Sequence, residues 1–199
     1  MILLPRSFYL RPDVVFIARE LIGKYLVTRM EGILSCGMIT ETEAYEGATD
    51  RASHAYGNRF TERTKVMYEE GGIAYVYLCY GIHSMFNIVT NRKGIPHAIL
   101  VRAIRPEEGL DVMRVRSGKT ASVKGFGDGP GKVAQILGIR TSHSGIDLTV
   151  IPAREDLPAI WIEDRGTEIP TGQVERTSRI GVGYAGDDAR LPYRFRLRG

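Results

Sequence analysis

Hydrophobic residues alternate with polar ones, at the two-residue period of a β-strand, over residues 84–90 and 193–198. One early stretch differs, because Val14, Ile17, Ala18 and Leu21 recur at helical spacing and Gly23 then ends the predicted helix. Further strands are predicted at 25–29, 33–42, 97–104 and 193–198, and further helices at 107–116 and 131–137. Strands outnumber helices and mostly neighbour one another, which favours an α+β fold. We expect a single domain over residues 1–199, built around a curved, mostly antiparallel β-sheet with peripheral short helices and a protruding β-hairpin.

The predicted hairpin covers residues 72–90, GIAYVYLCYGIHSMFNIVT. Tyr80-Gly81 separates its two hydrophobic runs, so the turn is expected there. Tyr80 is then left at the tip with no core to fill. An aromatic ring on a rigid hairpin can insert between stacked bases, although hairpin-end tyrosines more often pack on a neighbouring loop. Alternation along the strands places the following residues on one face: Tyr75, Tyr77 and Cys79, with Met85 and Asn87 as candidates for the same side.

The charge, the cysteine content and the absence of a recognisable targeting segment limit the kinds of protein that this chain can be. The net charge is only +4, which by itself does not require a polyanionic partner. Arginine supplies 21 of the 27 basic residues, and its planar fork suits phosphate contacts, although codon bias would produce the same excess. Cys36 and Cys79 fall in predicted strands, where we expect reduced, buried side chains. With no signal peptide or membrane span recognisable, we expect a cytoplasmic protein, nucleoid-associated if it is bacterial.

Two charged residues stand beside hydrophobic strands. Glu43 follows the strand predicted at 33–42, and a carboxylate at a strand end can serve as a general base, although a solvated surface role is commoner. Arg102 follows the apolar run at 97–101 and therefore needs a partner such as Glu43 or a phosphate; a purely structural ion pair is an equal alternative.

Several motifs occur together, in order, over nearly the whole chain. They are Glu43-Ala44-Tyr45, Tyr77-Leu78-Cys79-Tyr80-Gly81, Leu100-Val101-Arg102-Ala103, Gly129-Pro130-Gly131-Lys132 and Arg179-Ile180-Gly181-Val182-Gly183. In this combination the chain resembles the alkyladenine (3-methyladenine) DNA glycosylase family. The resemblance implies a monofunctional enzyme of base excision repair, without cofactor and monomeric. Such an enzyme flips alkylated or deaminated purines out of double-stranded DNA and hydrolyses the N-glycosidic bond, leaving an abasic site.

The resemblance also assigns roles to residues. Glu43 would activate the water, held in place with Arg102 and the backbone carbonyl of Val182. Tyr80 would intercalate into DNA, while Gly131 and Lys132 would contact phosphate. The base pocket would consist of Tyr45, Ala52, His54, Tyr77 and Asn87, with backbone amides near Ala52 and His54 reading the base edge.

Other patterns are weaker. Gly181 to Gly186 fits G-x-G-x-x-G, but Pro192 follows six residues later and does not suit a dinucleotide-binding βαβ unit. The histidines and cysteines show no metal-ligand spacing, so no metal is expected. Tyr184 departs from the family's pattern, and we do not expect it to contact the base. Arg194, Arg196 and Arg198 predict a basic edge strand that discourages pairing.

Two other functions remain open at this point. A non-catalytic module could bind damaged DNA with the same hairpin, but it would have no need for Glu43 and its partners. An enzyme on another N-ribosyl substrate, such as a free nucleoside, would have no need for the exposed Tyr80 or the basic loops.

Overall fold

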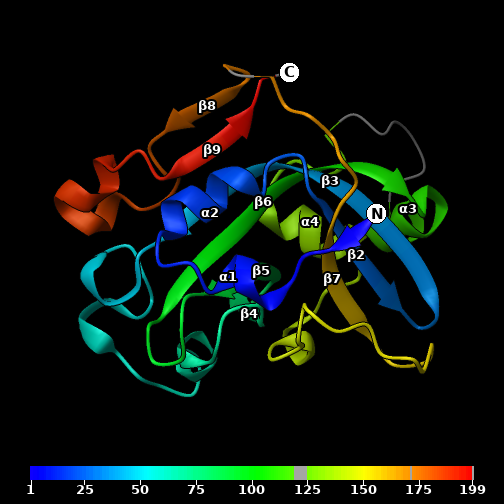
Figure 1. Ribbon diagram of the computed structural model, residues 1–199, viewed down its shortest axis with the longest axis horizontal. Coiled ribbons are helices and arrows are strands. Elements are labelled where there is room, and N and C mark those ends of the chain that lie inside the picture. Colours follow the sequence, from blue (N-terminus) through cyan, green and yellow to red (C-terminus); the bar gives the residue numbers. More distant parts are fainter. Residues whose placement is uncertain (119–124, 171, 199) are drawn as a thin grey trace.

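The strands of this protein form one open sheet in which every pair is antiparallel. The computed structural model describes residues 1–118, 125–170 and 172–198, and the sheet is curved around its helices (Figure 1). Strand order is β1-β7-β2-β3-β6-β5-β4, with β9 paired to β3 and β8 paired to β9. The bounds are β1 Ile2–Leu3, β2 Tyr25–Met30, β3 Ile33–Tyr45, β4 Ala74–Cys79, β5 His83–Thr90, β6 His97–Glu108, β7 Ala159–Asp164, β8 Val174–Thr177 and β9 Arg194–Leu197.

Short helices cover the sheet. They are α1 Arg6–Tyr9, α2 Val14–Glu20, α3 Leu110–Ser117 and α4 Pro130–Ile136, with 3-10 turns at Gly47–Thr49, Tyr56–Asn58, Lys65–Tyr68, Thr141–His143 and Gly183–Arg190. Asp13 begins α2 by accepting a hydrogen bond from the backbone of Phe16 at 2.8 Å. The buried sides of α2 and α4 share one hydrophobic core with the central strands. These features confirm the predicted α+β fold with a mostly antiparallel sheet.

In the described ranges, no helix has the length and apolar character needed to cross a membrane. Cys36 and Cys79 are free thiols, the first buried and the second half-buried. The basic residues Lys119 and Lys124, which we placed in a loop, lie outside the described residues.

Three predictions about the strands were wrong: the ends of two strands and the edge position of a third. β6 continues to Glu108, so Pro106 lies in a strand and not at the start of a helix. Pro106 is tolerated in the strand because β5 pairs only with residues 97–100 of β6. The end of β6 that contains Pro106 therefore has no neighbouring strand on that side. β3 continues to Tyr45, so Glu43 lies within the strand. Strand β9 is not an edge, because it lies between β3 and β8.

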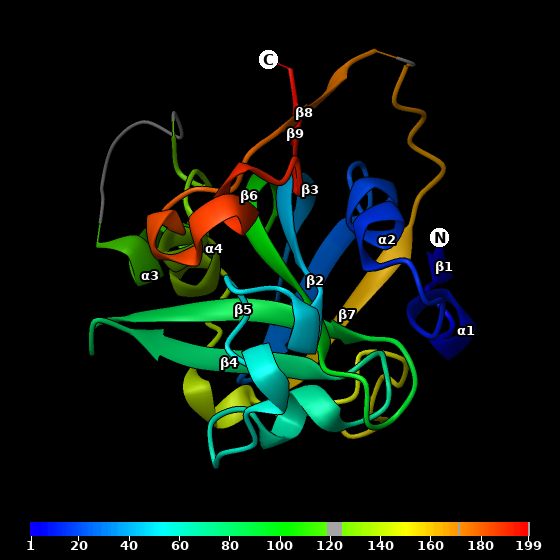
Figure 2. The same ribbon diagram turned by 90° about the vertical axis from the view of Figure 1, so that its left-hand side faces the viewer.

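The hairpin of β4 and β5 has the predicted turn (Figure 2). Tyr80 and Gly81 have φ values of 49° and 72°, as the two central residues of a type I′ turn require, and the Ile82 amide donates to the Cys79 carbonyl at 3.1 Å. Tyr80 is 93% exposed at the tip. Across the hairpin, Tyr75 lies opposite Asn87 and Tyr77 opposite Met85, which confirms that the four side chains share one face.

A matched pair of glycines tests how α3 is attached to the sheet. Gly109 and Gly118 flank α3 with φ values of 73° and 65°, so alanine at either site pays about 1–2 kcal/mol for left-handed backbone. A Cβ at Gly109 would also lie 2.5 Å from the Leu34 carbonyl oxygen, whereas nothing among the described residues lies within 4 Å at Gly118. Gly109→Ala should therefore reduce the free energy of unfolding, measured by urea denaturation, clearly more than Gly118→Ala. Equal losses would contradict this close packing.

Candidate active site

One face of the sheet carries a continuous row of side chains from five adjacent strands. Residues directly opposite each other in an antiparallel pair point to the same face, so the register of β4, β5, β6, β3 and β9 defines the row. The row reads Tyr75, Asn87, Leu100, Glu43 and Arg194. It brings the aromatic face of the hairpin and the carboxylate of Glu43 to the same side of the molecule, although the two are far apart in the sequence.

A β-bulge sets the direction of Arg102. Thr42 pairs with Val101 and Glu41 pairs with Ala103, so Arg102 is the extra residue on β6 between them. Such bulges bend a strand and redirect a side chain. Here the Arg102 Nε donates to Glu41 Oε1 at 2.9 Å, and an Nη lies 3.3 Å from Glu43 Oε1. The sequence predicted Glu43 as a partner of Arg102, but not the second partner Glu41.

Glu43 is completely buried, and each of its oxygens is bound. Its Oε1 accepts the backbone amide of Ile180 at 2.8 Å in addition to the contact with Arg102, and its Oε2 accepts the hydroxyl of Tyr45 at 2.8 Å. Burial, followed by the charge of Glu43, raises the pKa of Tyr45 well above 10, so the phenol keeps its proton and remains a donor. These contacts stabilise a buried carboxylate that would otherwise be costly.

The amide of Ile180 holds the segment 179–183 against the carboxylate. Val182 in that segment packs in a small apolar cluster with Ala52, Ala185 and Tyr45. Its carbonyl accepts one hydrogen bond, from the amide of Ala185 at 2.9 Å. A carbonyl oxygen has two lone pairs, so a second donor such as a water can still bind there.

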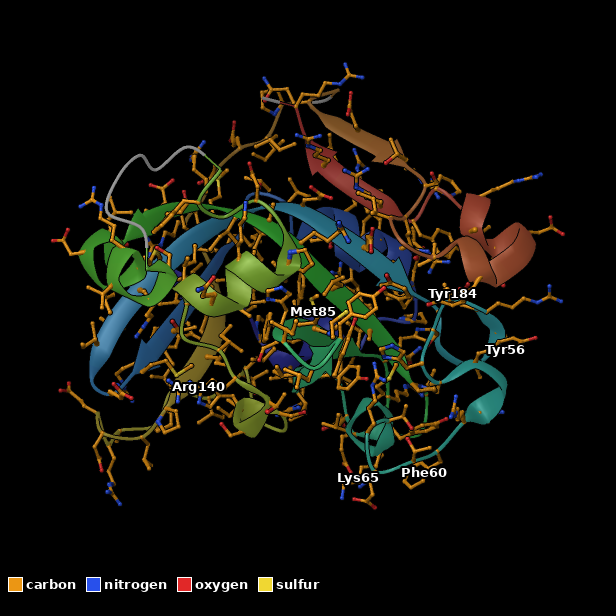
Figure 3. All side chains as sticks on the ribbon, turned by 180° about the vertical axis from the view of Figure 1, so that it is seen from behind. Tyr56, Phe60, Lys65, Met85, Arg140 and Tyr184 are labelled. Carbon is orange, nitrogen blue, oxygen red and sulfur yellow. The ribbon has the colours of Figure 1, made fainter. Side chains whose placement is uncertain are left out.

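The five residues predicted for a base pocket line one cavity of about 50 Å³. Tyr184, which we did not expect to contact the base, also lines this cavity, and its hydroxyl donates to the Ala52 carbonyl at 3.2 Å. Figure 3 shows Tyr184 where Gly183–Arg190 meets the loop after β3. The full lining is Tyr45, Ala52, Ser53, His54, Met67, Tyr75, Tyr77, Asn87, Ala98 and Tyr184. A wider groove of about 970 Å³ along the free side of β4 shares only Tyr77 with this cavity.

His54 is held as a neutral ring. An Nη of Arg63 lies 2.9 Å from its Nε2, and a guanidinium can only donate, so Nε2 is the acceptor. The proton is then on Nδ1, which donates to the hydroxyl of Tyr75 at 2.9 Å. Burial, followed by the charges of Arg63 and Arg59, lowers the pKa of His54 to about 4. The ring also lies edge-on to Tyr77, with centroids 4.6 Å apart.

The polar groups at the cavity differ in what they can still bind. The amide of Ala52 already donates to Asp50 at 2.9 Å, whereas among the described residues the amide of His54 has no intramolecular acceptor. His54 is therefore the better candidate of the two for reading a base edge. The side-chain NH2 group of Asn87 donates to the backbone carbonyls of Tyr75 and Met85, both at 3.2 Å. These bonds fix the orientation of the side chain and leave its oxygen as the acceptor.

A buried ion pair that the sequence did not reveal supports the site. Arg179 and Asp50 are both almost fully buried and form a two-pronged pair, with one contact of 2.9 Å. Arg179 also donates to the Ala44 carbonyl at 2.9 Å and stacks over the ring of Tyr45 at 4.8 Å. Burial alone would lower the pKa of Arg179, but the hydrogen bonds and charge of Asp50 raise it. Arg179 lies in the RIGVG motif, but no hydrophobic pattern around Asp50 indicates that it is buried.

The hairpin tip and the turn before α4 lie next to each other. A Cβ on Gly131 would lie 3.1 Å from the Cβ of His83, which is three residues from Tyr80. The amide of Gly129 donates to the Arg102 carbonyl at 3.0 Å, so the bulge also fixes this turn. Lys132 is exposed, and its Nζ lies 3.2 Å from the Gly125 carbonyl. The candidate phosphate-binding residues thus lie beside the hairpin that carries Tyr80.

The lowered pKa of His54 predicts a pH dependence of stability. Between about pH 6.5 and pH 4 the unfolded chain binds a proton at this position that the folded protein does not. The free energy of unfolding therefore falls on acidification through this window, by at most about 3 kcal/mol for this group. His54→Asn should flatten the dependence measured by urea denaturation, whereas His83→Asn at the exposed hairpin end should keep it. A His54 ring resonance that titrates near pH 6.5 by NMR would contradict the assignment.

The Asp50–Arg179 pair predicts a second, larger effect on stability. Arg179→Met leaves the Asp50 carboxylate buried without its counter-charge, and Asp50→Asn leaves the Arg179 guanidinium buried without one. Each change should lower the free energy of unfolding by about 3–5 kcal/mol. The double variant should lose clearly less than the sum of the two losses, because its second change removes an unpaired group. Strictly additive losses in thermal or urea unfolding would show that the pair is not coupled.

Comparison with known proteins identifies the family. The model of the methylpurine-DNA glycosylase (MPG) family matches residues 7–199. A Chlamydia felis protein is 43% identical over 196 residues, which cover 98% of this chain and 96% of that protein. A Myxococcus xanthus protein is 42% identical over 195 residues (98% and 90%), and one from Bdellovibrio bacteriovorus is 37% identical over 196 residues (98% and 95%). Each is named "Putative 3-methyladenine DNA glycosylase". The chain therefore belongs to the methylpurine-DNA glycosylase family, a family of DNA glycosylases, which are hydrolases acting on N-glycosyl bonds.

Proposed function

We propose that this chain is a monofunctional DNA glycosylase of base excision repair, active as a monomer and formed as one domain by residues 1–199. Its substrate is double-stranded DNA that contains alkylated or deaminated purines. The candidates are 3-methyladenine and 7-methylguanine, with hypoxanthine and ethenoadenine as further ones. The observation that carries the proposal is the buried Glu43, bound to Arg102 beside a cavity walled by aromatic rings.

Exposure at the hairpin tip supports base flipping. Tyr80 is almost fully exposed on a two-stranded support whose register is fixed, so its ring can fill the space that a flipped nucleotide leaves. Gly131 and Lys132 beside the hairpin would contact a backbone phosphate, with the charge of Lys132 favouring the anion. The flipped base would enter the cavity between Tyr45 and the His54–Tyr77 pair.

In the chemical step, a water bound by Glu43, Arg102 and the Val182 carbonyl attacks C1′ of the flipped nucleotide. A C1′–O bond forms, the C1′–N bond breaks, and Glu43 takes the water proton. A base that methylation has made cationic leaves as a neutral molecule, so one carboxylate suffices. A neutral deaminated purine leaves with a negative charge on its ring and then takes a proton from solvent water, which restores the neutral base. The product is an abasic site, because water, and not a lysine amine, is the nucleophile.

The pocket walls suit the proposed substrates. Aromatic faces attract electron-poor and cationic rings, and a neutral His54 adds no charge that would repel a methylated purine. Asn87 is held by two backbone carbonyls, so it cannot turn to satisfy a base that fits badly. Held in this orientation, Asn87 would crowd the exocyclic amine of normal guanine.

The test is single-turnover release of base from duplex oligonucleotides with one hypoxanthine or 1,N6-ethenoadenine, and from methylated DNA. We expect release by the wild type, while Glu43→Gln keeps lesion binding and loses release by roughly 10²–10⁴-fold or more, the usual range for a general base. Tyr80→Ala should instead weaken the binding of lesion-containing duplex. Tight binding with no release by the wild type would favour a non-catalytic damage-binding protein. Covalent trapping on DNA by borohydride would contradict the monofunctional mechanism.

A further inference from the structure

We propose that Glu41 is a positioning residue of the active site, which holds Arg102 in place and balances the charge around Glu43. The inference rests on the proposed glycosylase function and deepens it. Glu41 does not contact the cavity; it acts through Arg102. The sequence did not single it out, because an acidic residue next to the end of a predicted strand is usually solvated.

Glu41 belongs to a cluster of four charges that is shielded from solvent. The side chains of Glu41, Arg102 and Arg194 are 12%, 14% and 16% exposed, and that of Glu43 is fully buried. Arg102 Nε and Arg194 Nε donate to the same oxygen of Glu41, at 2.9 Å and 2.7 Å. The four side chains come from three adjacent strands, β3, β6 and β9, so the sheet itself fixes their separation.

This geometry orients the guanidinium of Arg102. The Nε of Arg102 donates to Glu41, and this bond fixes the plane of the guanidinium. An Nη of the same guanidinium then lies 3.3 Å from Glu43 Oε1. That contact is longer than the one to Glu41, so Arg102 is not turned fully onto Glu43. Among the described residues, the other oxygen, Oε2, accepts only the Tyr45 hydroxyl, so it keeps a lone pair for a further ligand such as the nucleophilic water. Without Glu41, Arg102 is free to turn fully onto Glu43 and compete with the water for its oxygens.

The cluster is also electrically balanced. Two carboxylates face two guanidiniums. Among the described residues, the groups that interact with the charge of Glu43 also include the phenols of Tyr45 and Tyr184 and the Arg179 cation, which has Asp50 as its own partner. Replacing Glu41 by a neutral residue leaves one excess positive charge. That charge would make Glu43 a weaker base and would oppose the positive charge that develops at C1′ in the transition state.

Charge restoration provides a sharp test. Glu41→Gln keeps the size of the side chain and removes its charge, and Arg194→Gln in the same chain returns the cluster to neutrality. Arg198→Gln is the matched control, because Arg198 is exposed just after the same strand and pairs with Glu175 instead of Glu41. Single-turnover release from a hypoxanthine duplex is measured from pH 4.5 to 8 for each protein, together with affinity for the lesion duplex and the thermal unfolding midpoint.

We expect Glu41→Gln to release base about 10–100-fold more slowly, with lesion affinity unchanged within about twofold. The pH at which activity is half lost on acidification should fall by about one unit, as for a carboxylate that gains a net positive neighbour. The double variant should return this half-loss point to its wild-type position and recover part of the rate. Arg198→Gln should match the wild type in base release, lesion affinity and pH profile.

Three results would overturn the inference. A wild-type rate and pH profile in Glu41→Gln would show that Glu41 has no role. A slower rate with an unchanged pH profile and no recovery in the double variant would reduce Glu41 to a structural residue. No base release by the wild type, either from the hypoxanthine duplex or from methylated DNA, would overturn the proposed function itself and the inference with it. Release by the wild type separates this failure from the other two.

Discussion

The burial of the Glu43 carboxylate is the constraint on which this structure depends. A fully buried charge is tolerated only when hydrogen bonds and opposite charges replace its water. Here those partners come from Tyr45 on the same strand, Arg102 on the neighbouring strand and the amide of Ile180 near the C-terminal end of the chain. The carboxylate therefore ties the centre of the sheet to segment 179–183. The Asp50–Arg179 pair connects the loop after β3 to the same segment, so two buried charge contacts hold segment 179–183 in place.

Much of this site could be anticipated from local patterns. Alternation along the hairpin predicted which aromatic side chains share a face, and the turn at Tyr80-Gly81 follows from the break between two hydrophobic runs. The apolar run before Arg102 correctly indicated a shielded arginine that needs a partner. These inferences worked because they depend on the period of a strand, which does not change with the tertiary structure. The family motifs then indicated which of many polar residues to consider together.

Other features depend on tertiary pairing that no local pattern encodes. The bulge at Arg102 exists only because β3 and β6 shift register there. Neither strand has a glycine at that point, which would have been a sequence signal for a bulge. Pro106 indicated a helix start, yet it lies in β6 where one side of that strand lacks a neighbouring strand. Arg194 was assigned to an edge strand from its basic neighbours, whereas pairing of β9 between β3 and β8 directs it to Glu41. Tyr184 reaches the cavity through the folding of a 3-10 turn, for which hydrophobic period gives no signal.

The residues proposed for the chemical step and the residue proposed for DNA contact differ in how firmly the fold holds them. The charged groups lie on paired strands at the middle of the sheet, where register fixes their separation and little solvent reaches them. Tyr80 is the opposite case. It adopts a left-handed conformation that costs a non-glycine residue about 1–2 kcal/mol, and with 93% of its surface exposed it recovers almost none of that cost by burial. Asparagine or glycine would make the same turn at lower cost. A large aromatic ring at this position therefore opposes the stability of the free protein, as expected if it serves the DNA contact proposed above.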